Sequence, residues 1–186
     1  MIDVQNIFSD VKYIPLNIYN DKRGFFSEIY NQNVFKKHGI SNSFIQDNIS
    51  YSLKKNTLRG LHFQLKPFSQ AKMIKVLKGS IYDVFIDLRK DSDEFEKHGF
   101  FELNQEQGWL LIPNGFAHGF LTTSDQTTVI YKVDNYYNKE KESGIIWNDS
   151  SFKIKWPCNK NNLIISEKDN SLLTWNSIKE SFIEEI

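Results

Sequence analysis

The sequence has few of the features that staple or anchor small proteins. Its 186 residues include a single cysteine, Cys158, so an internal disulfide is excluded. A lone thiol is typical of a reducing compartment. The first residues, MIDVQNIFSD, lack the basic and apolar segments of a signal peptide, and no stretch approaches the length of a transmembrane helix. We therefore expect a cytoplasmic protein that does not span a membrane.

Net charge is also absent. The 23 lysines and arginines balance the 23 aspartates and glutamates, so the formal net charge is zero. A sequence-independent nucleic-acid binder needs a basic face to displace counterions, and an electrostatic membrane anchor needs a basic cluster. We expect neither partner. The sequence also lacks a P-loop and the G-x-G-x-x-G, G-x-S-x-G and C-x-x-C motifs, which removes common signatures of nucleotide-binding, hydrolase and redox proteins.

Aromatic residues are abundant, with 15 Phe, 8 Tyr and 4 Trp. Such rings suit the lining of a barrel or a stacking site, although a core rich in Phe explains the same numbers. Short β-type segments recur along the chain, which favours one β domain over residues 1–186, a sandwich or barrel. The expected strands are 13–18, 25–30, 44–52, 72–77, 81–88, 109–112, 116–122 and 127–133.

Turns and helices are expected between and after these strands. The residues Lys78-Gly79-Ser80 predict a hairpin turn between two of them. A short helix over 33–38 should end at Gly39, and a helical stripe predicts a C-terminal helix within 171–186.

The segment Leu58–Gln64 contains the first candidate for chemistry, His62. Strict alternation puts His62 on the face shared with Gly60 and Gln64, and Arg59 on the opposite face. A glycine within a strand often marks a bulge, which would re-aim one of these side chains. A histidine on a strand is more often structural than catalytic, so both interpretations stay open.

Two further polar residues lie on faces that otherwise look apolar. Lys72 shares its face with Ile74 and Val76. A buried ammonium is costly and persists where an anion or a developing negative charge compensates it, unless the side chain snorkels to the barrel mouth. Tyr131 lies beside Val129 on another strand, where it is either a core ring or an inward-facing acid.

The segment 108–118, from Gly108 to His118, resembles the second motif of cupins. In metal-binding cupins the first motif supplies two histidines and a glutamate; here His62 matches the first histidine, while Gln64 and Lys72 take the other places. An ammonium among the ligands would repel a divalent ion. The resemblance therefore implies a mainly β, cupin-type double-stranded β-helix (jelly-roll) barrel without a metal site.

A longer series of motifs extends this resemblance over residues 3 to 170. In order, they are RGFFSE (23–28), QDN (46–48), LRGLHFQ (58–64), IPNGFAHGF (112–120), YK (131–132), GIIWND (144–149) and SEKD (166–169). Together they resemble the dTDP-4-dehydrorhamnose 3,5-epimerase family of cupin-fold enzymes. Residues 171–186 lie outside the resemblance as a helical extension.

The resemblance implies a cofactor-independent isomerase. Such an enzyme converts dTDP-4-dehydro-6-deoxy-D-glucose into dTDP-4-dehydro-L-rhamnose, a precursor of surface polysaccharides such as lipopolysaccharide. By resemblance, His62 is the base and pairs with Asp169, Tyr131 is the acid, and Lys72 lies near the C4 oxygen. The alternatives are an epimerase of C3 alone or of another NDP-4-keto sugar, and a non-catalytic cupin that binds sugar nucleotides.

The same resemblance implies a set of substrate contacts and a homodimer. Arg59 and His118 match contacts to the diphosphate, and Tyr137 matches a ring that stacks near the base. A strand carrying Arg23, Phe26 and Glu28 is expected to reach into the neighbouring subunit's site. The remaining substrate-contacting positions are Gln46, Asp47, Asn48, Glu142 and Lys168.

Overall fold

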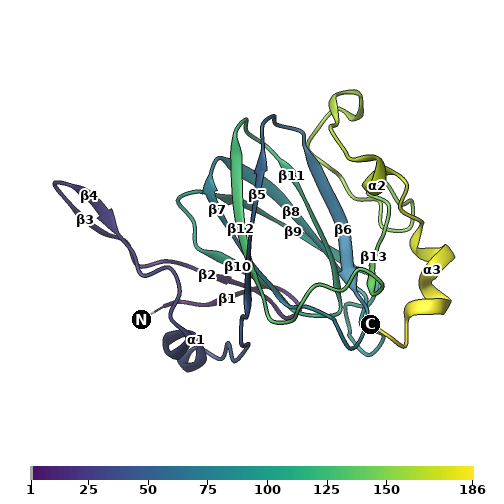
Figure 1. Ribbon diagram of the computed structural model, residues 1–186, viewed down its shortest axis with the longest axis horizontal. Coiled ribbons are helices and arrows are strands. Elements are labelled where there is room, and N and C mark those ends of the chain that lie inside the picture. The colour runs from purple at the N-terminus through teal and green to yellow at the C-terminus, as the bar shows by residue number, and fades with distance from the viewer. Residues whose placement is uncertain (1) are drawn as a thin grey trace.

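Two antiparallel sheets pack face to face in the computed structural model, which describes residues 2–186 (Figure 1). The first sheet has the order β1 (Gln5–Phe8), β2 (Val11–Ile14), β10 (Trp109–Ile112), β7 (Lys72–Lys78), β12 (Thr127–Val133), β5 (Gln46–Ser52). The second has the order β13 (Glu142–Gly144), β6 (Leu58–Gln64), β11 (Phe116–Thr122), β8 (Ser80–Asp87), β9 (His98–Asn104). The expected mainly β, cupin-type architecture is confirmed.

Alternation along β8 divides its apolar residues between two of the hydrophobic cores. On β8, Ile81 and Phe85 face the space between the sheets, where they pack with Val76 of β7. Tyr82 and Val84 face the other side and join a second core. This period of two is what a strand requires when both of its faces are buried.

The residues Lys78-Gly79-Ser80 connect β7 to β8, but these strands lie in different sheets, so the expectation of a hairpin is wrong. The chain crosses from one sheet to the other at Gly79, which has a φ of +83°. A Cβ there would lie 2.6 Å from the Thr127 hydroxyl oxygen. Because of this crossing, β7 and β8 contribute to opposite walls of the same interior.

The helices lie outside the sheets. The predicted helix over 33–38 is present as α1 (Gln32–Lys37), which Asn31 caps and which is followed by Gly39 at a φ of +79°. The expected C-terminal helix is α3 (Trp175–Phe182), shorter than the stretch 171–186. Between them lie η1 (Lys160–Asn162) and α2 (Glu167–Asn170).

Helix α3 closes the outer core of the five-stranded sheet. Trp175 and Ile178 are buried in it, and the backbone N–H of Trp175 donates to Asp149 Oδ2 over 2.6 Å. In Figure 1, α2 and α3 run along the outside of β6 and β13. None of the helices within residues 2–186 has the length and apolar character needed to cross a membrane.

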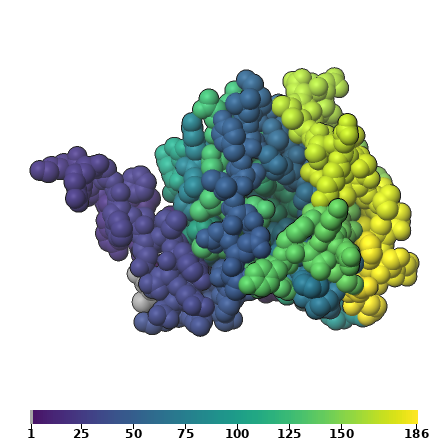
Figure 2. All heavy atoms as spheres, in the orientation of Figure 1, coloured from purple at the N-terminus to yellow at the C-terminus, as the bar shows by residue number. Residues whose placement is uncertain are grey.

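A hairpin of β3 (Tyr19–Asp21) and β4 (Gly24–Phe26) extends away from the two sheets (Figures 1 and 2). The expected strands over 13–18 and 25–30 are therefore wrong in their bounds, because the pairing is confined to the tip of the excursion. Its rings stand in solvent, with Phe25 73% and Phe26 68% exposed. Exposed apolar surface of this kind marks an interaction site.

Candidate active site

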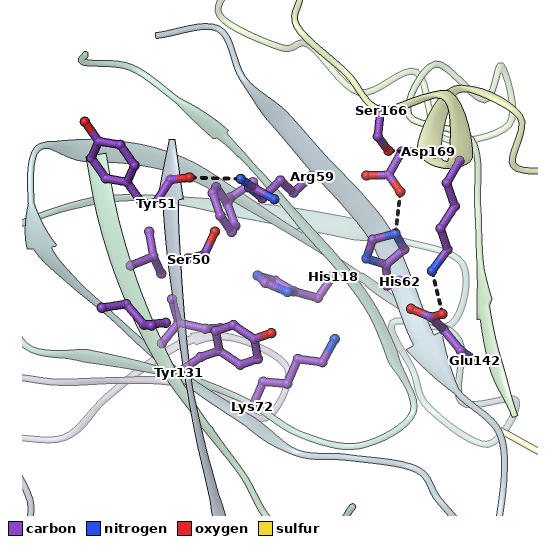
Figure 3. A pocket seen from close by; sticks show the side chains of 15 residues that line it. Ser50, Tyr51, Arg59, His62, Lys72, His118, Tyr131, Glu142, Ser166 and Asp169 are labelled. Atoms are coloured by element: carbon purple, nitrogen blue, oxygen red, sulfur yellow. Dashed lines mark hydrogen bonds and ion pairs between the residues drawn. The ribbon is translucent and has the colours of Figure 1, made fainter. Parts of the chain in front are cut away.

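A cavity of about 510 Å³ opens between the two sheets (Figure 3). Each sheet contributes one wall, and α2 and β13 close one side. The polar side chains in the lining are Ser50, Tyr51, Arg59, His62, Lys72, His118, Tyr131, Glu142, Ser166, Lys168 and Asp169.

A bulge in β6 brings Arg59 and His62 to the same wall. On β11, His118 pairs with His62 and Phe120 pairs with Arg59, so β6 has one residue more than its partner between these pairs. Gly60 has a φ of +114°, and a Cβ there would lie 2.6 Å from Gly119 Cα. The bulge thus overrides the alternation that would put Arg59 on the opposite face.

The imidazole of His62 is held by Asp169. The Nε2 atom of His62 lies 2.8 Å from Asp169 Oδ1, while Asp169 Oδ2 accepts the N–H of Gly60 over 3.1 Å. Ser166 caps α2 by accepting the N–H of Asp169, which fixes the carboxylate at the start of the helix. A carboxylate accepts a hydrogen, so Nε2 carries the proton and Nδ1 is left as the basic nitrogen.

The charge of Asp169 is secured by its neighbours. Burial alone would raise its pKa, but hydrogen bonds from His62 and Gly60, together with the Lys168 charge, hold the pKa of Asp169 below its usual value. An ionised Asp169 fixes the tautomer of His62 and stabilises the imidazolium that forms when His62 takes a proton.

Tyr131 lies on the opposite wall, on β12 of the other sheet. In Figure 3 its ring lies across the cavity from His62, and its hydroxyl points into the cavity toward Lys72. Burial raises the pKa of Tyr131, and the charge of Arg59 opposes that rise without cancelling it. The phenol therefore keeps its proton at neutral pH, so a base on one wall faces a proton donor on the other.

Between these two groups, Lys72 extends its ammonium into the cavity (Figure 3). Burial lowers the pKa of Lys72 to about 8, while the charges of Asp83 and Glu142 oppose the shift. Of the two interpretations open from the sequence, the structure favours the inward-facing ammonium: Lys72 is partly buried, it lines the cavity, and its strand neighbour Ile74 belongs to the inner core. A cation in this place can stabilise negative charge that develops on a bound molecule.

The mouth of the cavity holds a compact polar cluster. Glu142 Oε2 accepts hydrogen bonds from Lys168 Nζ over 2.5 Å and from the Tyr137 hydroxyl over 2.9 Å. Burial opposes the ionisation of Glu142, but Lys168 and Tyr137 hold its pKa below the usual value. This cluster places one anion and one cation beside His62.

Arg59 and His118 extend the positive character of the site. The guanidinium of Arg59 donates to the backbone oxygen of Tyr51 over 3.1 Å. His118 Nε2 lies 3.0 Å from Oδ2 of Asp83, a buried carboxylate behind the cavity wall. Asp83 was not among the site residues predicted from the sequence. Its signal was available, since Asp83 lies two residues from both Ile81 and Phe85 and so places a carboxylate on the inward face that they share.

Some of the residues expected at the site lie elsewhere in a single chain. The Arg23 side chain pairs with Asp21 at the tip of the projecting hairpin, which also carries Phe26, and Glu28 follows it. Of the motif 46–48, Gln46 donates to Asn48 over 2.9 Å, whereas Asp47 bonds Lys132 over 2.7 Å on the other side of β5. The cavity wall thus holds the predicted His62, Tyr131, Asp169, Lys72, Arg59, His118, Glu142 and Lys168.

The donor set of the cavity is unlike a metal centre. Within residues 2–186, no three His, Cys, Asp or Glu side chains are placed to hold an ion together. Gln64 occupies the second ligand position of the cupin motif, and its side-chain amide donates hydrogen bonds to the carbonyl oxygens of Phe68 and Tyr136.

Known proteins resemble this chain over most of its length. The family model described as dTDP-4-dehydrorhamnose 3,5-epimerase matches residues 5–177. The enzyme of that name from Shigella flexneri is 43% identical over 162 residues, which cover 86% of this chain and 88% of the relative. The one from Escherichia coli K12 is 42% identical over 175 residues, which cover 92% of each chain.

Solved structures show the same likeness. The Bacillus anthracis dTDP-4-dehydrorhamnose 3,5-epimerase with TDP and PPi bound is 44% identical with a TM-score of 0.90, and the match covers 94% of this chain and 99% of that one. A Legionella pneumophila 3,5-epimerase in complex with dTDP-4-keto-L-rhamnose is 35% identical with a TM-score of 0.91, over 97% and 96% of the two chains.

Proposed function

Because the chain belongs to the dTDP-4-dehydrorhamnose 3,5-epimerase family, we propose that it inverts C3 and C5 of a dTDP-4-keto-6-deoxyhexose. The product is the dTDP-4-dehydro-L-rhamnose used for rhamnose-containing surface polysaccharides. One observation carries the assignment to this site: His62 and Tyr131 stand on opposite walls of one cavity, with the Lys72 ammonium between them.

The chemistry follows from that arrangement. The hydrogens at C3 and C5 are acidic because each carbon adjoins the C4 ketone, which receives the electron pair as an enolate when His62 Nδ1 removes a proton. Lys72 stabilises the enolate oxygen, and one such preorganised donor is worth about 10²–10³ in rate. Tyr131 then donates its proton to the opposite face of the carbon, which inverts the centre.

Both groups must be reset before the second centre reacts. After one inversion His62 is protonated and Tyr131 is a phenolate, so a proton leaves the imidazole and another returns to the phenol through water. Each positioned proton-transfer group contributes about 10²–10⁴ in rate. The proposed steps are proton transfers only, so the proposed mechanism requires no cofactor.

The nucleotide is held beside this centre. Arg59 and His118 contact the diphosphate, while the ring of Tyr137 stacks on the base near Glu142 and Lys168. The motif 46–48 contributes further substrate contacts from β5. A lone cysteine suits the reducing cytoplasm, where nucleotide sugars of this class are made.

Solvent deuterium incorporation tests the function. In D2O, proton NMR of dTDP-4-keto-6-deoxyglucose should show the loss of signals at both C3 and C5 with the wild-type chain. His62→Ala should abolish exchange at both carbons, whereas Tyr131→Phe should retain abstraction and lose inversion. Exchange at C3 alone would establish a C3 epimerase, and tight binding of dTDP without exchange would establish a binding protein; either result overturns the double epimerisation.

We also propose a homodimer in which the hairpin β3–β4 completes the partner's site. A two-stranded hairpin is marginal alone, and the exposed rings of Phe25 and Phe26 gain their burial from a second copy. Arg23, Phe26 and Glu28 would then reach the partner's substrate, as the family resemblance implies.

Complementation between two inactive variants tests this sharing. In mixed dimers of His62→Ala and Arg23→Ala chains, a wild-type His62 meets a wild-type Arg23 only across the interface. Statistical mixing of a twofold dimer then restores about a quarter of the wild-type activity. Mixed dimers that are purified through a different affinity tag on each variant and show no recovery would show that each site is built from its own chain.

A further inference from the structure

We infer that Asp83, which does not line the cavity, is a positioning residue: it favours the charged form of Lys72 and fixes the orientation of the His118 ring. The inference rests on the proposed function and adds to it a group that never touches substrate. Asp83 lies on β8, behind His118, and its side chain is 0% exposed.

One oxygen of Asp83 orients His118. Asp83 Oδ2 lies 3.0 Å from His118 Nε2, and a carboxylate can only accept, so Nε2 carries a hydrogen. The ring is thereby fixed with Nδ1 as its remaining polar atom, and His118 itself lines the cavity. Without this partner, the imidazole would be free to change its tautomer or rotate about its side-chain bonds.

The other oxygen has no hydrogen-bond partner among residues 2–186. Asp83 Oδ1 is buried, and an unsatisfied buried oxygen of this kind destabilises the fold. A buried carboxylate of this kind is expected where its negative charge stabilises a cation. Lys72 interacts electrostatically with this carboxylate. Burial lowers the pKa of Lys72, and the charge of Asp83 opposes that fall. Burial raises the pKa of Asp83, and the charges of His118 and Lys72 oppose that rise.

Lys72 needs this support because its pKa is already about 8 through burial. A neutral amine cannot stabilise an enolate as an ammonium does. Glu142 also favours the charged form of Lys72, but its Oε2 atom is engaged by Lys168 and Tyr137 at the mouth. Asp83 is therefore the counter-charge within the wall. The charged and titratable groups that line the cavity with Lys72 are Tyr51, Arg59, His62, His118, Tyr131, Glu142, Lys168 and Asp169.

The pH profile of turnover tests the inference. Asp83→Asn keeps the shape of the side chain and an oxygen that can accept from His118, but it removes the charge. We expect the basic limb of the kcat profile, set by loss of the Lys72 proton, to move to lower pH. At neutral pH, kcat should fall by about 10- to 100-fold, less than the ~10²–10³ expected for loss of the whole donor.

A matched control lies on the same strand. Asp87 is also 0% exposed, but its carboxylate binds Arg89 over 2.6 Å and Ser92 over 2.7 Å, away from the cavity. Asp87→Asn should lower stability and leave the basic limb where the wild type has it. A basic limb unchanged in Asp83→Asn, or shifted equally in both variants, would overturn the inference.

Two measurements on the protein itself keep the outcomes separate. If Asp83→Asn does not fold, the carbon-13 shift of the Asp83 carboxyl in the wild type should be that of a carboxylate at pH 7, and a protonated acid there would refute the role. If the wild type gives no deuterium exchange, the proposed function fails. The nitrogen-15 titration of Lys72 Nζ in the wild type and in Asp83→Asn still tests the coupling, and equal midpoints would disprove it.

Discussion

Replacing Lys72 with Met should make the protein more stable and nearly inactive. Methionine fills a similar volume and has no charge to desolvate. Burial lowers the pKa of Lys72 from 10.5 to about 8, so folding destabilises the ammonium relative to the neutral amine. At 1.36 kcal/mol per pKa unit, the charged form costs about 3 kcal/mol of folding free energy at neutral pH. For a domain of this size, that gain raises the Tm by about 6–12 °C.

The pH dependence of this gain has a definite sign. The folded pKa lies below the unfolded one, so the cost is fully present below pH 8 and disappears as the pH rises to 10.5. Thermal unfolding followed by circular dichroism should therefore show a gap between Lys72→Met and wild type that is widest below pH 8. Deuterium exchange in the variant should fall by about 10²–10³, because the enolate loses its cationic partner.

Lys75 provides the matched control on the same strand. It is 5% exposed, and its ammonium donates to the Gln107 carbonyl oxygen over 2.6 Å, outside the cavity. Lys75→Met should leave the exchange rate unchanged. The reasoning fails if Lys72→Met is less stable than the wild type at pH 7, or if its stability gap is as wide at pH 10.5 as at pH 7.

Two other substitutions test how His62 is held. Gly60→Ala would place a Cβ 2.6 Å from Gly119 Cα, at a φ of +114°. The resulting strain of about 1–3 kcal/mol or more should lower the Tm and the activity together. A Tm equal to that of the wild type would contradict this packing. Asp169→Asn would let an amide N–H face His62 Nε2 and so move the ring hydrogen to Nδ1. We expect kcat to fall by about 10²–10⁴ with the affinity for dTDP unchanged. Full turnover in this variant would exclude the assigned tautomer.

Several features of the site followed from the order of residues alone. Lys72, Ile74 and Val76 are two residues apart, and side chains two apart on a strand share a face. This spacing placed an ammonium on an apolar face. The resemblance of the motifs placed the base and the acid on separate strands. The same period of two would have revealed Asp83, had a carboxylate between Ile81 and Phe85 been weighed in the same way.

Other features depended on contacts between distant segments. His62 and Asp169 are 107 residues apart, and only the docking of α2 against β6 brings them within 2.8 Å. The turn at Gly79 has the composition of a hairpin turn, yet it joins two different sheets. A turn sequence specifies local dihedral angles, whereas the sheet that each strand joins depends on which distant strands offer it a partner.

The amino-acid sequence by itself determined most of the strands in the two sheets, their apolar faces and the family of the chain, but not β9 or the bounds of the projecting hairpin. The tertiary structure decided which side chains meet. The bulge at Gly60 turns both Arg59 and His62 inward, against the alternation of a regular strand, because β6 must pair with β11 around one extra residue. The two walls of the cavity form only when the sheets pack together. That packing is driven by the burial of apolar residues from the whole chain, so no single segment of the sequence specifies it.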